Sequence, residues 1–368
     1  MYRQIGLITG GGDAPGLNAV IRAVVRTGVR QYGMDVVGIE NSFEGLLDDK
    51  MIRELKTSDV IGLLPRGGTI LGTCNTGNFC RYSDKGEVIY PPEPFERSLK
   101  NMELLGIEAL VVLGGEGTLG IAEQFHKRGF PIVGVPKTID NDLAATELTF
   151  GFMTAIDIAT EALDRLHTTA ESHNRVMILE VMGRNTGWIA LHAGLTGSAD
   201  IILIPEIPFV MEKVVEAVKA RDSSGSRFTN IVVAEGACEL GGEEIYLENG
   251  TASKVKRLGG IGENLRQRIE EATGKESRTV VLGHLQRGGS PNSFDRMLAT
   301  NFGAAAVHSL AEGERGRMVA LKSSTVVTVP LEEAIVNIKK VTLEGQSVRT
   351  ARDIGISFAA PDEPEYIV

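Results

Sequence analysis

Residues 5–26 read IGLITGGGDAPGLNAVIRAVVR and contain the pattern that decides the fold. The apolar run 5–9 is typical of a buried strand, GGGDAPG at 10–16 of a loop, and 19–30 of a helix with its apolar residues at helical spacing. A buried strand followed by a glycine loop and a helix is half of a parallel βαβ unit. The chain holds 44 glycines in 368 residues, where about 7% is usual, so further glycine loops are expected.

The same plan recurs along the chain. Residues 109–113 run into GGEGTLG at 114–120 and a helix to about 127, and residues 131–135 run into PKTIDND at 136–142. After about residue 150 the pattern restarts, with strand-like runs at 176–181, 200–204, 231–234 and 279–282. We therefore expect an α/β fold of two Rossmann-like lobes with mostly parallel sheets that face an active-site cleft.

Three stretches lack this periodicity. Residues 75–94 and 241–256 are polar and contain glycine or proline, which predicts long loops or small hairpins. The last twenty residues, which end in APDEPEYIV, show no clear period and are expected to be peripheral.

Composition narrows the classes of partner. The net charge is −10 and both signs are interspersed, which disfavours nucleic acid and membrane surfaces but leaves small anionic ligands open. The chain has three cysteines, Cys74, Cys80 and Cys238, an odd number without a zinc or redox spacing, as in a reducing cytosol. With no long apolar stretch, a soluble cytoplasmic protein is expected.

Three strand ends carry glycine and acids together: GGGDAPG, GGEGTLG and PKTIDND. The carboxyl ends of neighbouring parallel strands form the crevice where α/β proteins bind ligands. Glycines there let backbone amides approach phosphate groups, and the following helices direct their positive ends at them. None of these loops is a Walker A motif, and none fits GxGxxG with the following acid that binds a ribose. Each loop taken alone also fits an ordinary strand-to-helix turn.

Carboxylates beside phosphates require a cation or a reacting proton. Glu116, Asp140 and Asp142 therefore predict Mg²⁺ and a general base at this edge. Taken alone, Asp142 fits a turn or helix cap equally well.

The second half of the chain supplies side chains suited to a phosphorylated substrate. Arginine binds phosphate with two parallel hydrogen bonds, and the candidates stand near predicted strand ends: Arg175, Arg184, Arg278, His284 and Arg287. His284 fits a core histidine equally well at this stage.

Seven ordered motifs resemble the phosphofructokinase family. They are TGGGDAPGLNAVIRAVV, GGEGTLG, PKTIDND, TFGFMTA, EVMGR with the following GWIA, AEGA and GHLQRGGSPNSFDR, and they extend from residue 5 to about 310. The resemblance implies phosphoryl transfer from ATP to the 1-hydroxyl of fructose 6-phosphate, which gives fructose 1,6-bisphosphate in glycolysis. It also implies a lobe of residues 1–150 plus about 285–314 for ATP and Mg²⁺, and a lobe of 151–284 plus about 315–368 for the sugar phosphate.

The resemblance also assigns residues. It implies that Gly11, Gly115, Glu116, Gly117 and Thr118 bind the donor, with Glu116 near Mg²⁺, and that Asp140 takes the proton beside Thr138, Asp142 and Arg184. Sugar-phosphate contacts fall on Thr138, Asp140, Arg175, Met182, Gly183, Arg184, Glu235, Arg278, His284 and Arg287. A homo-oligomer, a tetramer or a dimer, is implied, in which Arg175 and Arg278 reach a neighbouring subunit's site.

The sequence departs from the family pattern in two places. Lys137 resembles the branch that uses pyrophosphate, whereas Gly117 stands where that branch carries aspartate, so the pair Gly117 and Lys137 resembles a mixed subgroup that includes ATP users. The loop LGTCNTGNF offers Asn75 where many members have arginine, so a cation near the transferred group is missing unless Arg81 or Lys137 replaces it.

Three alternatives stay open on the sequence alone. The first is a pyrophosphate-dependent phosphofructokinase. The second is an NAD or lipid kinase, because GGEGTLG resembles the GGDGT loop of those enzymes. The third is a non-catalytic, sugar-phosphate-binding regulatory subunit, which the Asn75 departure would fit.

Overall fold

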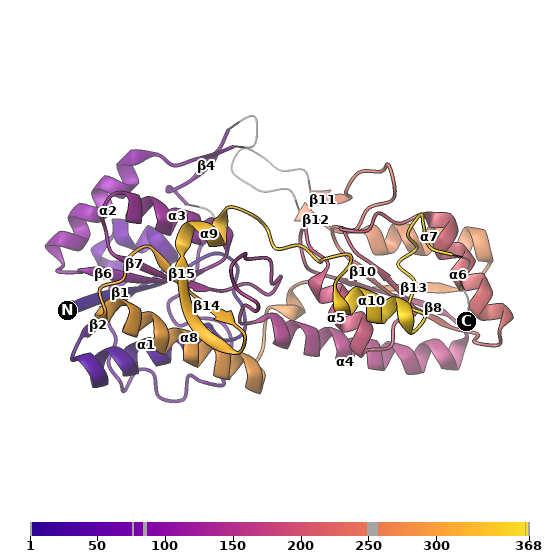
Figure 1. Cartoon of the computed structure of the whole chain (residues 1–368), viewed down its shortest axis with the longest axis horizontal. Coiled ribbons are helices and arrows are strands. Elements are labelled where there is room, and N and C mark those ends of the chain that lie inside the picture. Colours follow the sequence, from indigo (N-terminus) through magenta and orange to yellow (C-terminus); the bar gives the residue numbers. More distant parts are fainter. Residues whose placement is uncertain (1, 76, 84–86, 249–256, 365, 367–368) are drawn as a thin grey trace. The chain divides into compact units, whose positions relative to one another are not determined.

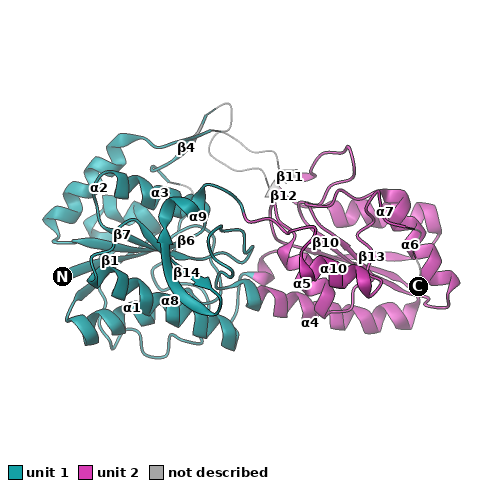
Figure 2. Cartoon of the chain, viewed as in Figure 1, with its two compact units in different colours: residues 1–154, 252–254, 287–338 teal, residues 155–251, 255–286, 339–368 magenta. Residues whose placement is uncertain are grey.

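A computed structural model describes residues 2–75, 77–83, 87–248, 257–364 and 366. The chain forms two compact units, and each has its own sheet (Figures 1 and 2). The first unit comprises 1–154, 252–254 and 287–338, and the second comprises 155–251, 255–286 and 339–368. The expected α/β class with two Rossmann-like lobes is confirmed.

The first unit contains a seven-stranded sheet in the order β15-β14-β7-β6-β1-β2-β3. Neighbours from β14 to β2 pair in parallel, and the edge strands β3 and β15 are antiparallel. The strands are β1 (Gln4–Thr9), β2 (Asp35–Ile39), β3 (Ile52–Glu54), β6 (Ala109–Gly114), β7 (Ile132–Pro136), β14 (Arg317–Lys322) and β15 (Thr325–Pro330).

Alternating side chains of these strands fill two cores, one on each face of the sheet. Ile5 and Leu7 pack with α1 (Leu17–Tyr32) and α8 (Ser293–Ala311). Ile8 points to the other face, where α2 (Pro92–Leu104), α3 (Glu116–Lys127) and α9 (Leu331–Ile335) supply the apolar partners. Figure 1 shows α1 and α8 together on one side of the sheet and α2 and α3 on the other. This two-sided burial explains why the strands read as continuous apolar runs.

The second unit contains a four-stranded, fully parallel sheet in the order β13-β8-β10-β9. The strands are β8 (Val176–Val181), β9 (Ile201–Leu203), β10 (Thr229–Ala234) and β13 (Ser277–Val281). One face packs against α6 (Met211–Ser223) and α7 (Ile261–Thr273), and α5 (Trp188–Thr196) packs on β9 and β10. The long helix α4 (Phe152–His173) leads into this unit, and α10 (Gln346–Asp353) packs on α5.

Short elements complete the chain. The 3-10 helices are η1 (Ser42–Leu47), η2 (Asp49–Met51) and η3 (Gly283–Gln286). Two small antiparallel pairs, β4 (Arg81–Tyr82) with β5 (Val88–Ile89) and β11 (Tyr246–Glu248) with β12 (Arg257–Leu258), lie in or next to the stretches predicted as loops or hairpins. Residues 76, 84–86 and 249–256 of those stretches lie outside the described residues, and α2 already begins at Pro92.

Two expectations about the end of the chain need correction. Residues 315–338 belong to the first unit, because β14 pairs with β7 and β15 closes the sheet. The last twenty residues are not all peripheral, since Phe358 and Ala359 are fully buried and Ser357 pairs with Ile201 at the edge of the second sheet. Phe358 and Ala359 are too short an apolar run to show a period, although they pack in the core.

Candidate active site

The first glycine loop, residues 10–16, joins β1 to α1. The Gly10 amide donates to the Leu113 carbonyl (2.9 Å), the Gly11 amide donates to the Cys74 carbonyl (3.3 Å), and the Thr73 hydroxyl donates to the Gly11 carbonyl. Gly11 adopts a φ of 74°, which favours glycine. A Cβ atom there would lie 3.3 Å from Thr118 Oγ1 and 3.4 Å from Lys137 Nζ. The three predicted loops therefore meet at this point.

The second glycine loop carries β6 into α3. No side chain caps the amino end of α3, whose first residues Glu116 and Gly117 are exposed and whose Thr118 is buried. The first amides of a helix lack partners within the helix, and together with the helix dipole they attract anions. A Cβ atom on Gly117 would meet nothing within 4 Å. The space beside Gly117, at the amino end of α3, is therefore open to a ligand.

The third loop, residues 137–142, is named here the base loop and follows β7. Lys137, Thr138 and Asp140 are at most 7% exposed, and Asp142 is partly exposed. The Asp140 amide donates to Thr138 Oγ1 (3.1 Å), and Asn141 has a φ of 52° while its side-chain oxygen accepts from the Thr149 amide (3.1 Å). The loop is a fixed turn, which holds Asp140 in one place.

Lys137 is the buried cation among these loops, and its ammonium group donates to the carbonyl oxygen of Gly12. Burial, and next the neighbouring Arg287 guanidinium, lower the pKa of Lys137 from 10.5 to about 8. The carboxylates of Asp140, Asp142 and Asp13 act in the opposite direction. Lys137 is therefore largely protonated at pH 7 and lies within the electrostatic reach of three acids.

Arg287 belongs to the first unit and approaches the same loop. Its Nη1 donates to the Asp13 carbonyl (3.1 Å), and a Cβ atom on Gly12 would lie 2.9 Å from that nitrogen. Lys137 and Arg287 thus bind consecutive carbonyl groups of the glycine loop. Sequence reasoning assigned neither contact, and it overlooked Asp13 and Thr73, although both stand inside motifs that it quoted.

Asn75 and Arg81, named in the sequence analysis, lie in the segment beside the first glycine loop. Asn75 lines a small cavity of about 40 Å³ together with Ser42, Phe43, Cys74 and Phe79. Arg81 is exposed on β4. Of the two cations considered as replacements for the family arginine, Lys137 is the one that lies among the three loops.

In the second unit the candidate sugar residues form two groups. One group lies at the carboxyl ends of the strands. Val181 pairs with Ala234 and Glu180 pairs with Val281, so the residues that follow β8, β10 and β13 lie at the same end of the sheet. They are Met182, Gly183, Arg184, Glu235 and His284. His284 is exposed, so it is not a core histidine.

The segment 182–187, named here the sugar loop, is held in an unusual conformation. Arg184 has a φ of 53°, a region that L-residues rarely occupy. Its amide donates to Glu235 Oε1 (3.1 Å), and its carbonyl lies 2.1 Å from where a Cβ atom on Gly236 would stand, so only glycine fits there. The exposed Arg184 side chain is presented from a fixed backbone.

Arg175 and Arg278 form the second group, at the amino ends of the strands. Arg175 precedes β8, and Arg278 lies opposite Met177 near the amino end of β13. Both bind Glu276, which Arg175 contacts at 2.7 Å, and the Arg175 hydrogen bond lowers the pKa of that carboxyl group. A strand of six residues separates this pair from the sugar loop, roughly 20 Å. The structure therefore does not bring these two arginines to the sugar loop of the same chain.

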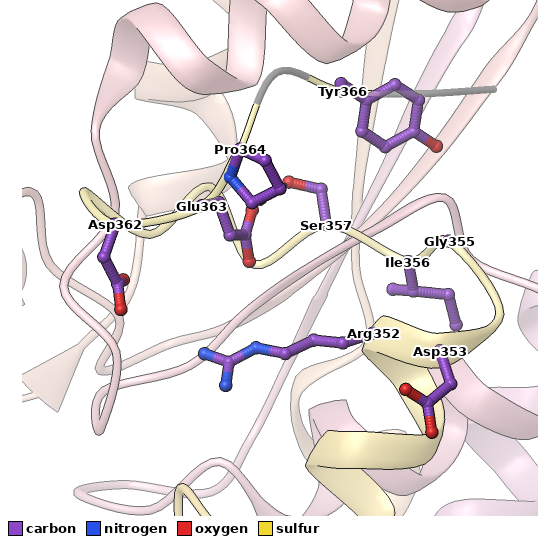
Figure 3. A pocket seen from close by; sticks show the side chains of 9 residues that line it. All are labelled: Arg352, Asp353, Gly355, Ile356, Ser357, Asp362, Glu363, Pro364 and Tyr366. Carbon is purple, nitrogen blue, oxygen red and sulfur yellow. Dashed lines mark hydrogen bonds between the residues drawn. The ribbon is translucent and has the colours of Figure 1, made fainter.

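A larger cavity, of about 430 Å³, involves none of the candidate residues. It is lined in the second unit by residues of α10 and the chain end, among them Arg352, Asp353, Asp362 and Glu363 (Figure 3). With one arginine against three carboxylates, it is poorly suited to a phosphate group. Among the described residues no cluster of three or more acids, histidines or cysteines is arranged to hold a metal ion.

Comparison with known proteins identifies the family of this chain. Two α/β units with glycine loops at the carboxyl ends of parallel strands define the class of Rossmann-like proteins. Residues 4–310 match the family model described as Phosphofructokinase. The chain belongs to the phosphofructokinase family.

Individual relatives differ in the donor that their names give. An ATP-dependent 6-phosphofructokinase of Chloroflexus aggregans is 57% identical over 97% of this chain and 98% of its own. A pyrophosphate–fructose 6-phosphate 1-phosphotransferase of Streptomyces coelicolor is 50% identical over 92% of this chain and 96% of its own. The solved phosphofructokinase of Pichia pastoris is 33% identical with a TM-score of 0.80, and the match covers 91% of this chain but only 35% of the yeast chain.

No helix among the described residues is long and apolar enough to cross a bilayer.

Proposed function

We propose that this chain transfers a phosphoryl group from ATP to the 1-hydroxyl of fructose 6-phosphate, a kinase reaction of glycolysis. One observation carries the proposal. The neighbouring strands β1, β6 and β7 bring two glycine loops and the base loop to one edge, with Asp140 nearly buried among them. Glycine loops suit a polyphosphate donor and a positioned carboxylate suits a hydroxyl acceptor. The relative that is 57% identical carries this activity in its name.

In the proposed reaction Asp140 accepts the proton of the sugar 1-hydroxyl. The hydroxyl oxygen forms a bond to the γ-phosphorus, and the bond from that phosphorus to the β-phosphate oxygen breaks, so ADP leaves with that electron pair. Because a carboxylate is a weak base, the proton moves late in a loose transition state. Lys137 and Arg287 hold the glycine loop and add positive charge beside it, and Thr138 fixes the turn that positions Asp140.

The residues fit Mg²⁺ bound mainly through the donor. Glu116 is exposed at the amino end of α3 and Asp142 is partly exposed, and Mg²⁺ is usually bound by one or two carboxylates plus substrate phosphates. We propose Glu116 as the protein carboxylate nearest that ion. Mg²⁺ held there would supply charge neutralisation for the donor phosphates.

The choice of donor rests on Gly117. The open space at its Cβ position leaves room for the α-phosphate and nucleoside of ATP. Gly11, Gly115, Gly117 and Thr118 are the proposed donor contacts. Pyrophosphate is the second candidate donor, since Lys137 lies among the loops and relatives 50% identical use it by name.

The two groups of sugar residues lead us to propose a homo-oligomer. The sugar loop, Glu235 and His284 would bind fructose 6-phosphate, and Arg184 is proposed as the catalytic residue of the sugar loop. Arg175 and Arg278 lie at the other edge of their sheet and share Glu276. We propose that they serve a neighbouring subunit's site, and their distance from the sugar loop of their own chain supports this proposal.

The proposal is tested by product identification. The protein is incubated with fructose 6-phosphate, Mg²⁺ and ATP, and phosphorus NMR is used to find the new ester. A phosphomonoester at C1 supports the proposal, and ATP hydrolysis without sugar phosphorylation contradicts it. We also propose a cytosolic location, which fits the absence of a disulfide between the described cysteines Cys74, Cys80 and Cys238.

A further inference from the structure

The sugar loop is anchored by a second carboxylate, Glu206. Its Oε2 accepts from the Gly187 amide at 3.0 Å, and its Oε1 accepts from the Val341 amide at 2.9 Å. Glycine is required at 187, because a Cβ atom there would lie 2.3 Å from Ile204 Cβ and 2.9 Å from Glu206 Oε2. One carboxylate thus joins the end of the sugar loop to a residue more than a hundred positions later.

Trp188 reinforces the same attachment. Its indole Nε1 donates to the Lys339 carbonyl at 2.8 Å, and the Lys339 ammonium stands 5.8 Å from the centre of its ring. Val341 is 5% exposed, so its contact with Glu206 is shielded from water. Residues 339 and 341 are therefore bound to residues 187 and 188, through the Glu206 carboxylate and through the hydrogen bond from Trp188 to Lys339.

The residue just before this attachment is fixed to the other unit. The chain passes from the first unit to the second between Ile338 and Lys339 (Figure 2). Ile338 forms an antiparallel bridge with Leu143, the residue directly after the base loop. Four consecutive residues, 338–341, are thus bound at one end next to the base loop and at the other next to the sugar loop.

We infer that residues 338–341 are a tether that couples the base loop to the sugar loop, with Glu206 and Trp188 as positioning residues at its second end. The inference rests on the proposed function of the two loops. A short chain held at both ends transmits a shift of one loop to the other, because peptide geometry leaves it little slack. Ligand binding at one loop then changes the affinity of the other loop for its own ligand by the same factor in both directions.

The sharpest test slackens the tether and leaves its attachments in place. A Gly-Ser insertion between Ile338 and Lys339 keeps the Leu143, Trp188 and Glu206 contacts. The matched control is the same insertion between Glu312 and Gly313, both exposed in a turn of the first unit. The tether insertion should lower kcat/KM for fructose 6-phosphate at least tenfold, because small misplacements at a reacting centre are costly. Values within twofold of the control insertion would overturn the inference.

A second measurement reads the coupling without turnover. Trp188 is the one tryptophan of the sequence, so its emission reports on the tether and follows fructose 6-phosphate binding. In the wild type a non-hydrolysable ATP analogue should change the sugar-phosphate Kd at least fivefold, and in the insertion variant it should not. An equal Kd with and without the analogue in the wild type would also overturn the inference.

Glu206 is tested by graded substitutions. Glu206→Ala removes the hydrogen bonds to the Gly187 and Val341 amides. It should shift the Trp188 emission, raise KM for fructose 6-phosphate roughly three- to tenfold, and abolish the effect of the ATP analogue on the sugar-phosphate Kd. Glu206→Gln should fall between alanine and the wild type, because Oε1 by itself accepts from the Gly187 amide at 3.1 Å as well as from the Val341 amide. Glu363→Ala removes a carboxylate that likewise binds a backbone amide, that of Phe358 at 2.9 Å, and should lower stability without changing either KM.

The outcomes separate the two claims. A wild-type protein that fails to phosphorylate the sugar but shows the Kd shift would refute the proposed function and keep the tether. Phosphorylation with no Kd shift would refute the tether and keep the function.

Discussion

Lys137 donates a hydrogen bond to the carbonyl oxygen of Gly12, a residue 125 positions earlier in the chain. This bond joins the base loop to the first glycine loop. A shift of the proposed base Asp140 is therefore coupled to a shift of the proposed donor-binding loop. It also places a cation with a pKa of about 8 beside Asp140, Asp142 and Asp13. A residue that the sequence indicates as a donor selector is, in the structure, a link between two loops.

The pKa of Lys137 predicts a specific pH dependence of stability. Its folded-state pKa of about 8 lies below the unfolded value of 10.5, so between these values the unfolded chain binds more protons at this residue, and stability rises with pH there. The unfolding free energy of the wild type minus that of Lys137→Met should therefore increase from pH 8 to 10.5, by up to about 3 kcal/mol. Urea unfolding of both proteins across this range measures it, and a flat difference would disprove the pKa shift.

Asp140→Asn should keep the fold and lower kcat by about 10²- to 10⁴-fold, the usual contribution of a positioned base. The amide is isosteric, and the backbone bond from Asp140 to Thr138 remains. Asp142→Asn serves as the comparison, and its effect should be smaller because Asp142 is only partly buried. Steady-state kinetics decide the matter, and a variant of Asp140 with half the wild-type kcat would remove it from the base role.

Gly117→Asp should abolish ATP turnover without harming the fold. A Cβ atom at this position meets no protein atom within 4 Å, and an acid in the first turn of α3 suits the helix dipole. A like charge about 4 Å from a phosphate costs roughly 4 kcal/mol at an effective dielectric near 20. Pyrophosphate should be tolerated, because it has no α-phosphate or nucleoside to displace.

Two companion variants separate the causes. Gly117→Asn adds similar bulk without charge and should lose less ATP activity than the aspartate. Lys137→Gly should weaken any pyrophosphate activity more than ATP activity. Equal losses in Gly117→Asp and Gly117→Asn would show that bulk, and not charge, excludes the nucleotide.

The proposed subunit sharing predicts complementation between impaired chains, measured at fructose 6-phosphate concentrations near the wild-type KM. Arg175→Ala and Arg278→Ala should each raise KM for fructose 6-phosphate by about ten- to a hundredfold, because a charge-assisted hydrogen bond is lost. Mixed oligomers of Arg175→Ala with Asp140→Asn chains should regain activity, since some sites then receive both native residues. A mixture as inactive as its components would place Arg175 in the site of its own chain or outside any site.

Much of the fold could be predicted because buried parallel strands leave a strong local signal. The strand 176–181 has the same bounds in the structure, and the three loop motifs occupy the expected strand ends. The sequence also placed Arg175 before that strand and Arg184 after it, which already implied opposite edges. The prediction failed for strands whose partners are distant in sequence. Residues of β14 and β15 were assigned to the second lobe, although β14 pairs with β7, which lies far earlier in the chain.

The contacts that position the site had no local signal. The bond from Lys137 to Gly12 and the anchoring of Gly187 by Glu206 with Val341 join residues far apart in sequence. Only the folded chain brings these groups together. The motifs therefore predicted which residues carry chemistry, and the structure was needed to see what holds those residues in place.

The central claim is tested most directly by one comparison of donors. Initial rates with fructose 6-phosphate and Mg²⁺ are measured side by side for ATP and for pyrophosphate, and kcat/KM is obtained for each donor. The open space at Gly117 predicts that ATP is the better donor by at least tenfold. Efficient turnover of pyrophosphate with none of ATP would contradict the account and show that Lys137 sets the donor.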